Sequence, residues 1–256
     1  MKTGVAITTY NSEDYFSKLF ESLPRDKIDE LVVINGGDEY KNNYKEAHWL
    51  QHHTNCNPSR CRNDGLNFLA ERDVDFYFII EDDMIIKDSS ILERYIQALE
   101  DSRLGYLCFT STSWGSGEPG ARTPEMEMQV SKDTTICLYP NMCNEFTVRT
   151  RSCLKDSGNF NVDFTSMWDV ENVYRISNTS HMYGFWRFPD IKNSDDYIMN
   201  NPDATSRIND GGKRDKIMEQ EYEKFKQTTG VYVQQIPKQT SVEIITSAET
   251  LMGNQI

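Results

Sequence analysis

Three adjacent carboxylates directly follow a strongly apolar run. Glu81, Asp82 and Asp83 come after residues 76–80, which are all aromatic or branched aliphatic. Placing such charges at the end of a buried strand is costly unless a cation compensates. Residues i and i+2 of a strand point to the same side, so Glu81 and Asp83 could face one bound ion. Carboxylate oxygens suit Mn²⁺ or Mg²⁺, which often share their coordination shell with substrate phosphates. The alternative is a solvated acidic turn before the next helix, although Asp88 fits that capping role better.

Strands and helices in alternation would position these carboxylates. Three continuous apolar runs predict strands covered on both faces, at residues 5–9, 31–34 and 76–80. Apolar residues at three- and four-residue spacing predict a helix after each strand, at residues 15–23, 59–70 and 91–99. This order predicts an α/β fold with a mostly parallel central sheet flanked by helices.

A polar segment follows each predicted strand, at residues 8–11, 35–38 and 81–83. Ligands of parallel sheets bind beyond the carboxyl ends of the strands, so we expect these three segments to meet at one crevice. The second half of the chain is less regular. Its predicted elements are strands at 107–110 and 146–148, a strand-like run at 181–188, a loop around Trp114 at 111–124, and helices at 169–176 and 213–227.

Composition narrows the class of protein. The 256 residues carry 27 Lys and Arg against 40 Asp and Glu, a net charge of −13 that disfavours nucleic acid as a bulk electrostatic partner. No apolar run approaches the ~18–20 residues of a membrane helix, and the first residues lack the features of a signal peptide, so a cytoplasmic protein is expected. The six cysteines form no C-x-x-C pair and are interpreted as core thiols. With no cysteine at zinc spacing, His48, His52 and His53 are interpreted as loop residues.

An ordered set of motifs resembles the nucleotide-sugar-binding half of GT-A fold glycosyltransferases, most closely the large family-two type. The first strand ends in T-T-Y-N at residues 8–11, where that family has T-x-Y-N after apolar residues. The following R-N-D-G at 62–65 resembles its A-R-N-x-G, with Cys61 in place of Ala. E-D-D at 81–83 stands where the family has D-x-D. The resemblance covers residues 3–100 and, less closely, 143–176.

The resemblance implies a role for several single residues. Thr8, Thr9 and Tyr10 would line the base and ribose, and Arg62 would lie near the diphosphate. Asp83 would bind the metal, while Glu81 or Asp82 would touch the ribose and metal-bound water. The second strand departs from the family pattern, because it ends in N-G-G-D at 35–38. The acidic role at the base or ribose then either shifts to Asp38 or is lost. For Arg62 the alternative is an ordinary surface arginine of a helix.

F-T-S-M-W-D-V-E-N-V-Y-R at residues 164–175 resembles the acceptor-side helix of the family, with Trp168 where Glu is common. Asp169 aligns with the general base, the carboxylate that removes the proton of the acceptor hydroxyl in inverting transfer. Capping of a helix is the alternative for Asp169, and the two roles are compatible. His181 is a candidate third metal ligand, with a packed or surface histidine as the alternative.

The resemblance implies a metal-dependent enzyme that moves a sugar, with inversion, from a nucleoside-diphosphate donor such as a UDP-sugar to an acceptor hydroxyl. It implies one catalytic domain over residues 1–230, with a donor half at 1–100, an acceptor half at 101–230 and an extension at 231–256. The expected acceptor is a glycan or polysaccharide precursor.

Three alternatives remain open. A phage-type enzyme could glycosylate hydroxymethylated DNA, using the basic groups Arg60 and Arg62, Arg149, Arg151 and Lys155, or Lys213 and Arg214. A nucleotidyltransferase would normally carry a glycine-rich basic loop after the first strand, which residues 9–12 lack. A non-catalytic module would bind the nucleotide sugar and leave it intact.

Overall fold

The computed structural model describes residues 1–42, 44–53, 56–109, 123–140, 145–182, 186–202, 213–236 and 243. The expected loop around Trp114 lies outside the described residues, apart from its last two positions. The same is true of most of the predicted extension at 231–256, and of the side chains of Lys213 and Arg214.

A six-stranded central sheet organises the described part of the chain, in the order β3-β2-β1-β4-β9-β6. Strands β1, β2, β3 and β4 are parallel, and β9 lies antiparallel between β4 and β6. The prediction of a mostly parallel sheet is therefore confirmed. The bounds are β1 Thr3–Thr9, β2 Glu30–Asn35, β3 His48–Gln51, β4 Phe76–Glu81, β6 Tyr106–Cys108 and β9 Phe146–Thr150.

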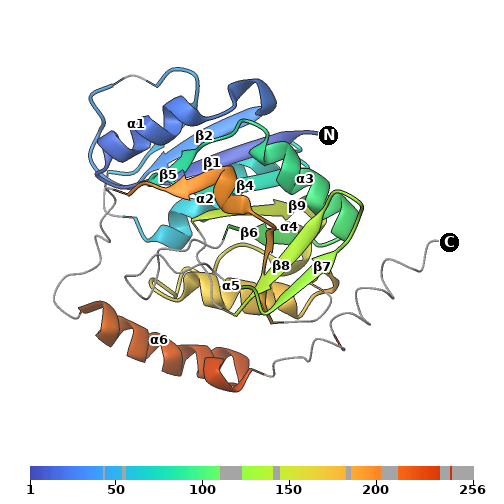
Figure 1. Cartoon of the computed structure of the whole chain (residues 1–256). Helices are drawn as coiled ribbons and strands as arrows, with labels where there is room; N and C mark the ends of the chain where they lie inside the picture. Colours follow the sequence, from blue (N-terminus) through green and yellow to red (C-terminus); the bar gives the residue numbers. More distant parts are fainter. Residues whose placement is uncertain are drawn as a thin grey trace.

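Helices cover both faces of this sheet because alternate strand residues point to opposite sides. Ala6, Val32 and Ile79 pack with residues of α2, whereas Ile7 and Phe78 belong to the cluster that contains residues of α1 and α3. Figure 1 shows α5 on the other side of the molecule from α1, with α6 beyond it. The helices are α1 Glu13–Ser22, α2 Pro58–Ala70, α3 Ile91–Ser102, α4 Arg151–Ser157, α5 Trp168–Ser177 and α6 Lys213–Thr229.

Two small antiparallel sheets complete the described fold, in the orders β10-β8-β7 and β11-β5. Their strands are β5 Met84–Ile86, β7 Met126–Gln129, β8 Thr135–Tyr139, β10 Phe188–Ile191 and β11 Ile198–Asn200. The strand-like run predicted at 181–188 is wrong over its start, where Ser180–Met182 form a 3₁₀ turn, and β10 begins only at Phe188. His48 is not a loop residue as predicted but begins β3.

Gly65 lets α2 lie directly against the sheet. A Cβ atom at this position would lie 2.7 Å from Ala6 Cβ and 2.8 Å from Ile34 Cδ1, both closer than van der Waals contact. We therefore expect Gly65→Ala to lower the free energy of unfolding by about 1–3 kcal/mol in urea, as overpacking does. Arg60→Ala on the exposed side of α2 is the control. Because Ala alone favours a helix by about 1 kcal/mol over Gly, a gain in stability would contradict this packing.

Candidate active site at the carboxyl ends of the parallel strands

The ends of β1, β2 and β4 meet as predicted. Thr8 lies in register with Ile34 on one side and Glu81 on the other, and Thr9 pairs with Asn35. The polar segments that follow these strands are therefore neighbours, and the edge they share is the candidate site.

Asp82 fastens the end of β4 to the turn after β1. Its Oδ2 accepts hydrogen bonds from Thr9 Oγ1 at 2.6 Å and from the backbone N–H of Tyr10 at 3.2 Å, and it also contacts Ser12 Oγ. The Thr9 hydroxyl meets the Tyr40 hydroxyl as well. Thr9 and Asp82 are both buried, and their hydrogen bond holds the turn after β1 against the end of β4.

The segment after β2 is held by amide side chains. The Asn35 side chain donates to the Asp38 carbonyl at 2.6 Å and accepts from the Gly37 N–H at 3.0 Å. Asn11 accepts from the Asp38 N–H at 2.7 Å, so the turns after β1 and β2 are joined directly. The side chains of Asp38 and Tyr10 are exposed at this edge, where an incoming ligand could meet them.

Arg62 is buried against the site and is not the surface arginine of the alternative interpretation. Its guanidinium pairs with Glu81 and stacks on Trp168, with the central carbon 3.6 Å from the ring centroid. Trp168 thus supplies a cation–π contact at the position where the family commonly has Glu. The Nε and Nη1 atoms of Arg62 are buried and have no hydrogen-bond partner among the described residues. A fixed cation with two unsatisfied donors is suited to bind anionic oxygens.

Asp169 lies in the first turn of α5 and is not its N-cap, which is Met167. Burial raises the pKa of its carboxyl from the ordinary 3.8 to about 6. The nearby charge of Arg62 lowers this pKa and that of Glu81 raises it, so Asp169 shares the electrostatic environment of that ion pair. A carboxylate whose pKa is displaced toward neutrality by burial fits a general base.

Glu221 of α6 was not identified from the sequence, yet it anchors the segment that carries Asp169. Its buried carboxylate accepts three successive backbone N–H groups, from Thr165 at 2.5 Å, Ser166 at 2.9 Å and Met167 at 2.7 Å. These donors lie at the start of α5, where a negative charge is favoured by the helix dipole. Glu221 therefore fixes both the start of α5 and the position of α6.

We expect Glu221→Ala to lower the free energy of unfolding by about 2 kcal/mol, because it leaves buried N–H groups without a charged acceptor. Chemical denaturation compared with Glu219→Ala, an exposed residue of the same helix, measures the effect. Equal stability of the two variants would contradict the anchoring role.

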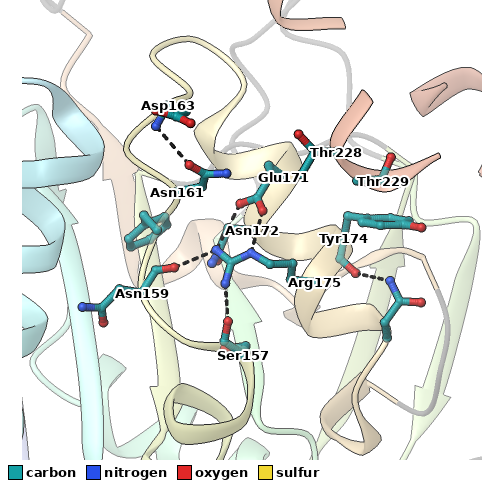
Figure 2. A network of polar contacts seen from close by, with 12 residues as sticks. Ser157, Asn159, Asn161, Asp163, Glu171, Asn172, Tyr174, Arg175, Thr228 and Thr229 are labelled. Carbon is teal, nitrogen blue, oxygen red and sulfur yellow. Dashed lines mark hydrogen bonds and ion pairs between the residues drawn. The ribbon is translucent and has the colours of Figure 1, made fainter. Parts of the chain in front are cut away.

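The other end of the same helix is held by the network in Figure 2. Arg175 pairs with the buried carboxylate of Glu171 at 2.6 and 3.0 Å, donates to the Asn159 carbonyl at 2.7 Å and contacts the Ser157 carbonyl. These contacts tie α5 to the chain that leaves α4. The arginine of the family-like motif is thus a positioning residue in this protein.

A further acidic side chain at the edge was missed in the sequence. Glu145 precedes β9, and its carbonyl accepts from the Glu81 N–H at 2.7 Å. Its carboxylate contacts the Asn200 side chain, and the Asp83 carbonyl accepts from the Asn201 N–H at 2.6 Å. Glu145 carries no local motif, because only the antiparallel pairing of β9 with β4 brings it beside the acidic triplet.

The structure separates His181 from this edge, which corrects its assignment as a metal ligand. Its Nε2 lies 2.8 Å from Asp156 Oδ2, and its ring lies against Gly105. A shallow pocket at this position is also lined by Phe76 and Thr150. Phe76 begins β4, whereas Glu81 ends it, so His181 and the acidic triplet lie at opposite ends of the sheet.

The sheet order, the flanking helices and the polar edge define an α/β protein with the GT-A fold. Among solved structures, the mannosyltransferase PcManGT from Pyrobaculum calidifontis, in complex with GDP-Man and Mn²⁺, matches over 98% of this chain and 69% of its own. The two chains are 15% identical, with a TM-score of 0.56.

TarS of S. aureus is also similar. Its structure matches 78% of this chain at 17% identity, with a TM-score of 0.57, and a TarS 1-349 complex with UDP-GlcNAc matches 82% at 18% identity, with a TM-score of 0.53. The present chain spans 36% and 60% of those two chains, respectively. No protein-family model and no curated protein matches the sequence. No helix within the described residues is long and apolar enough to cross a membrane.

Proposed function

We propose that this protein is a metal-dependent glycosyltransferase that moves a sugar from a nucleoside-diphosphate donor to an acceptor hydroxyl. The observation that carries the proposal is one edge of the sheet that combines a buried arginine, an acidic triplet and a carboxylate of raised pKa. The solved proteins of this fold include enzymes in complex with UDP-GlcNAc and with GDP-Man and Mn²⁺, which supports a nucleotide-sugar donor.

The acidic side chains suit a hard divalent cation. Glu81 and Asp83 offer carboxylate oxygens at the end of β4, the donor type that Mn²⁺ and Mg²⁺ prefer, and the Glu145 backbone lies beside them. In this proposal Asp83 holds the ion. When bound, the ion neutralises charge on the diphosphate. Thr8 and Tyr10 line the nucleoside with Asp38, while Thr9 and Asp82 keep the turn after β1 in place.

The chain's own side chains perform the remaining steps. The unsatisfied N–H groups of Arg62 bind diphosphate oxygens and stabilise the charge that grows on the leaving group. Asp169 accepts the proton of the acceptor hydroxyl as that oxygen attacks the anomeric carbon. Attack opposite the leaving diphosphate inverts the configuration at that carbon, and the Trp168 ring keeps the guanidinium in place during the step.

We propose a glycan or polysaccharide precursor as the acceptor, in preference to modified DNA. Of the basic residues considered for DNA, Arg60, Arg151 and Lys155 are exposed in the described part of the chain. Arg149 is buried, and the exposed Arg151 lies 3.1 Å from Asp75. A carboxylate beside Arg151 weakens its attraction for phosphate, so the segment 149–155 offers little support for a DNA groove.

The test is a panel of UDP-sugars and GDP-mannose incubated with the protein and Mn²⁺, followed by acceptor panels of glycans and of hydroxymethylated DNA. Release of nucleoside diphosphate together with a glycosylated product supports the proposal. Pyrophosphate release would identify a nucleotidyltransferase, and an intact bound donor would identify a binding module. Transfer to DNA that weakens with salt would overturn the choice of acceptor. Asp83→Asn should lose the turnover that Mn²⁺ supports while the protein remains folded.

The pKa of Asp169 predicts the pH dependence of the reaction. A base acts only when deprotonated, so kcat/KM should fall about tenfold per pH unit below a pKa of about 6.

The free energy of unfolding provides a second measurement of this pKa. Between pH 3.8 and about 6 the unfolded chain loses this proton before the folded chain does, so the free energy of unfolding should fall as pH rises through that interval. Asp169→Asn removes this contribution, and an unchanged slope in the variant would contradict the raised pKa.

A further inference from the structure

Two thiols and an imidazole gather beside the candidate site without belonging to it. The side chains of His52, Cys56 and Cys61 each bring one ligand atom within 4.8 Å of the others. The sequence predicted core thiols and loop histidines here, because the spacing H-x₃-C-x₄-C matches no familiar zinc pattern. Cys56 is half-buried, so the prediction of a core thiol is wrong at that position.

Separate anchors in the fold bring the three groups together. The His52 N–H donates to the Asn35 carbonyl at 2.9 Å, which extends the pairing of β3 with β2. Cys56 directly precedes Asn57, the N-cap of α2, whose side chain accepts from the Ser59 N–H at 2.8 Å. Cys61 lies in the first half of α2 and points at Gly36, where a Cβ would come within 3.3 Å of its sulfur. The cluster is therefore held by the sheet on one side and a capped helix on the other.

A carboxylate stands next to the imidazole. Asp64 follows Cys61 by three residues and so lies on a neighbouring part of the α2 surface, with its Oδ2 2.9 Å from His52 Nε2. His52 Nε2 makes no hydrogen bond to a described residue in this geometry. A carboxylate that accepts from a ligating histidine is the arrangement that orients imidazoles in metal sites. Both His52 and Asp64 are partly exposed, so an ion could reach the cluster from solvent.

We propose that His52, Cys56 and Cys61 bind one Zn²⁺ ion, with Asp64 supporting the imidazole. Thiolate and imidazole ligands select Zn²⁺ over Mg²⁺ or Mn²⁺, so this site is chemically distinct from the carboxylate edge at Asp83. At a Zn–S distance of about 2.3 Å, two tetrahedral sulfurs lie about 3.8 Å apart, so ligand atoms within 4.8 Å of one another need only small movements. Binding forms two Zn–S bonds and releases the two thiol protons to water.

The proposed ion would join the chain that follows β3 to the start of α2. Both cysteines lie near Gly36, where an added Cβ would come within 3.3 Å of Cys61 Sγ and 3.5 Å of Cys56 Cβ, and the Gly36 N–H donates to the Thr9 carbonyl at 2.9 Å. The ion would thus stiffen the outer side of the turns after β1 and β2. With three protein ligands, the fourth position is left to water, and the site does not depend on the proposed transfer reaction.

Cobalt substitution tests the site in the full chain. Reduced protein freed of metal with a chelator is titrated with Co²⁺ and then with Zn²⁺. We expect one equivalent of Co²⁺ to produce a thiolate-to-cobalt charge-transfer band that Zn²⁺ abolishes and excess Mg²⁺ does not. Zn²⁺ should also raise the thermal unfolding midpoint.

Variants locate the ligands. Cys56→Ser and His52→Ala should lose the band, while His53→Ala, which changes the adjacent exposed histidine, should keep it. Asp64→Asn should weaken binding by about 10- to 100-fold, as loss of a supporting carboxylate does. Asp83→Asn should bind Co²⁺ with the same band, which separates this site from the cation of the proposed reaction.

Two results would overturn the proposal. One is wild-type protein with both thiols reduced, shown by thiol titration, that develops no charge-transfer band. The other is a band that survives in both Cys56→Ser and His52→Ala. If Cys61→Ser fails to fold, the His52→Ala variant still decides the question, because His52 is partly exposed.

Discussion

Asp169→Asn is expected to lower kcat by about 10²–10⁴ while leaving donor affinity within a few-fold of wild type. The amide keeps the shape of the side chain and can still accept from the Val170 N–H, which lies 2.7 Å from Oδ1. It cannot take up the proton of the acceptor hydroxyl. Because the carboxyl acts on the acceptor, the loss should fall on transfer, with little change in the dissociation constant of the nucleotide sugar. Steady-state kinetics and calorimetric donor titration separate the two quantities.

Asp163→Asn is the matched control for this variant, since Asp163 is an exposed carboxylate of the segment that leads into α5. It should retain turnover within about twofold, as surface changes away from the site usually do. If Asp169→Asn turned over like the wild type, Asp169 would not be the general base of the proposed reaction. Equal losses in both variants would point to damage in the segment as a whole.

Arg62→Ala is expected to lower kcat by about 10²–10³ and to weaken donor binding, because a preorganised charge facing the leaving diphosphate disappears. The loss should exceed that of a surface cation, since this guanidinium is buried and held by both Glu81 and Trp168. Arg62→Lys should recover only part of the activity. Lysine keeps the charge but lacks the planar group that stacks on the ring and pairs with a carboxylate.

Arg60→Ala, two residues earlier on the exposed side of α2, serves as the control for charge on this helix. Removing Arg62 also leaves Glu81 without its cation, so the thermal unfolding midpoint must be measured beside the kinetics. A double variant, Arg62→Met with Glu81→Gln, removes both charges of the pair. If Arg62→Ala binds and turns over the donor like wild type, the diphosphate role is wrong.

The local pattern of apolar residues was sufficient to predict the three strands that carry the candidate site. The runs at 5–9, 31–34 and 76–80 are apolar because both faces of a parallel sheet are covered, and they became β1, β2 and β4. The short strands β7, β8 and β11 were not predicted from the sequence, since three to five residues give little periodicity to detect. The helix at 169–176 was predicted nearly to its observed bounds. Its position near Arg62 results from tertiary packing and was not predictable from the local pattern.

What the sequence alone determined is the α/β alternation and the chemical character of the strand ends, because both depend on residues that are close along the chain. The tertiary structure decided which of those groups work together. In the folded chain, Asp82 is hydrogen-bonded to Thr9, and His181 lies at the opposite end of the sheet from the acidic triplet. The tertiary structure also brought Glu145 and Glu221 to the site from distant segments, and joined His52 to two cysteines. The physical reason is that strand register and helix packing determine which partner a buried polar group meets. Neither can be predicted from the spacing of residues that are close along the chain.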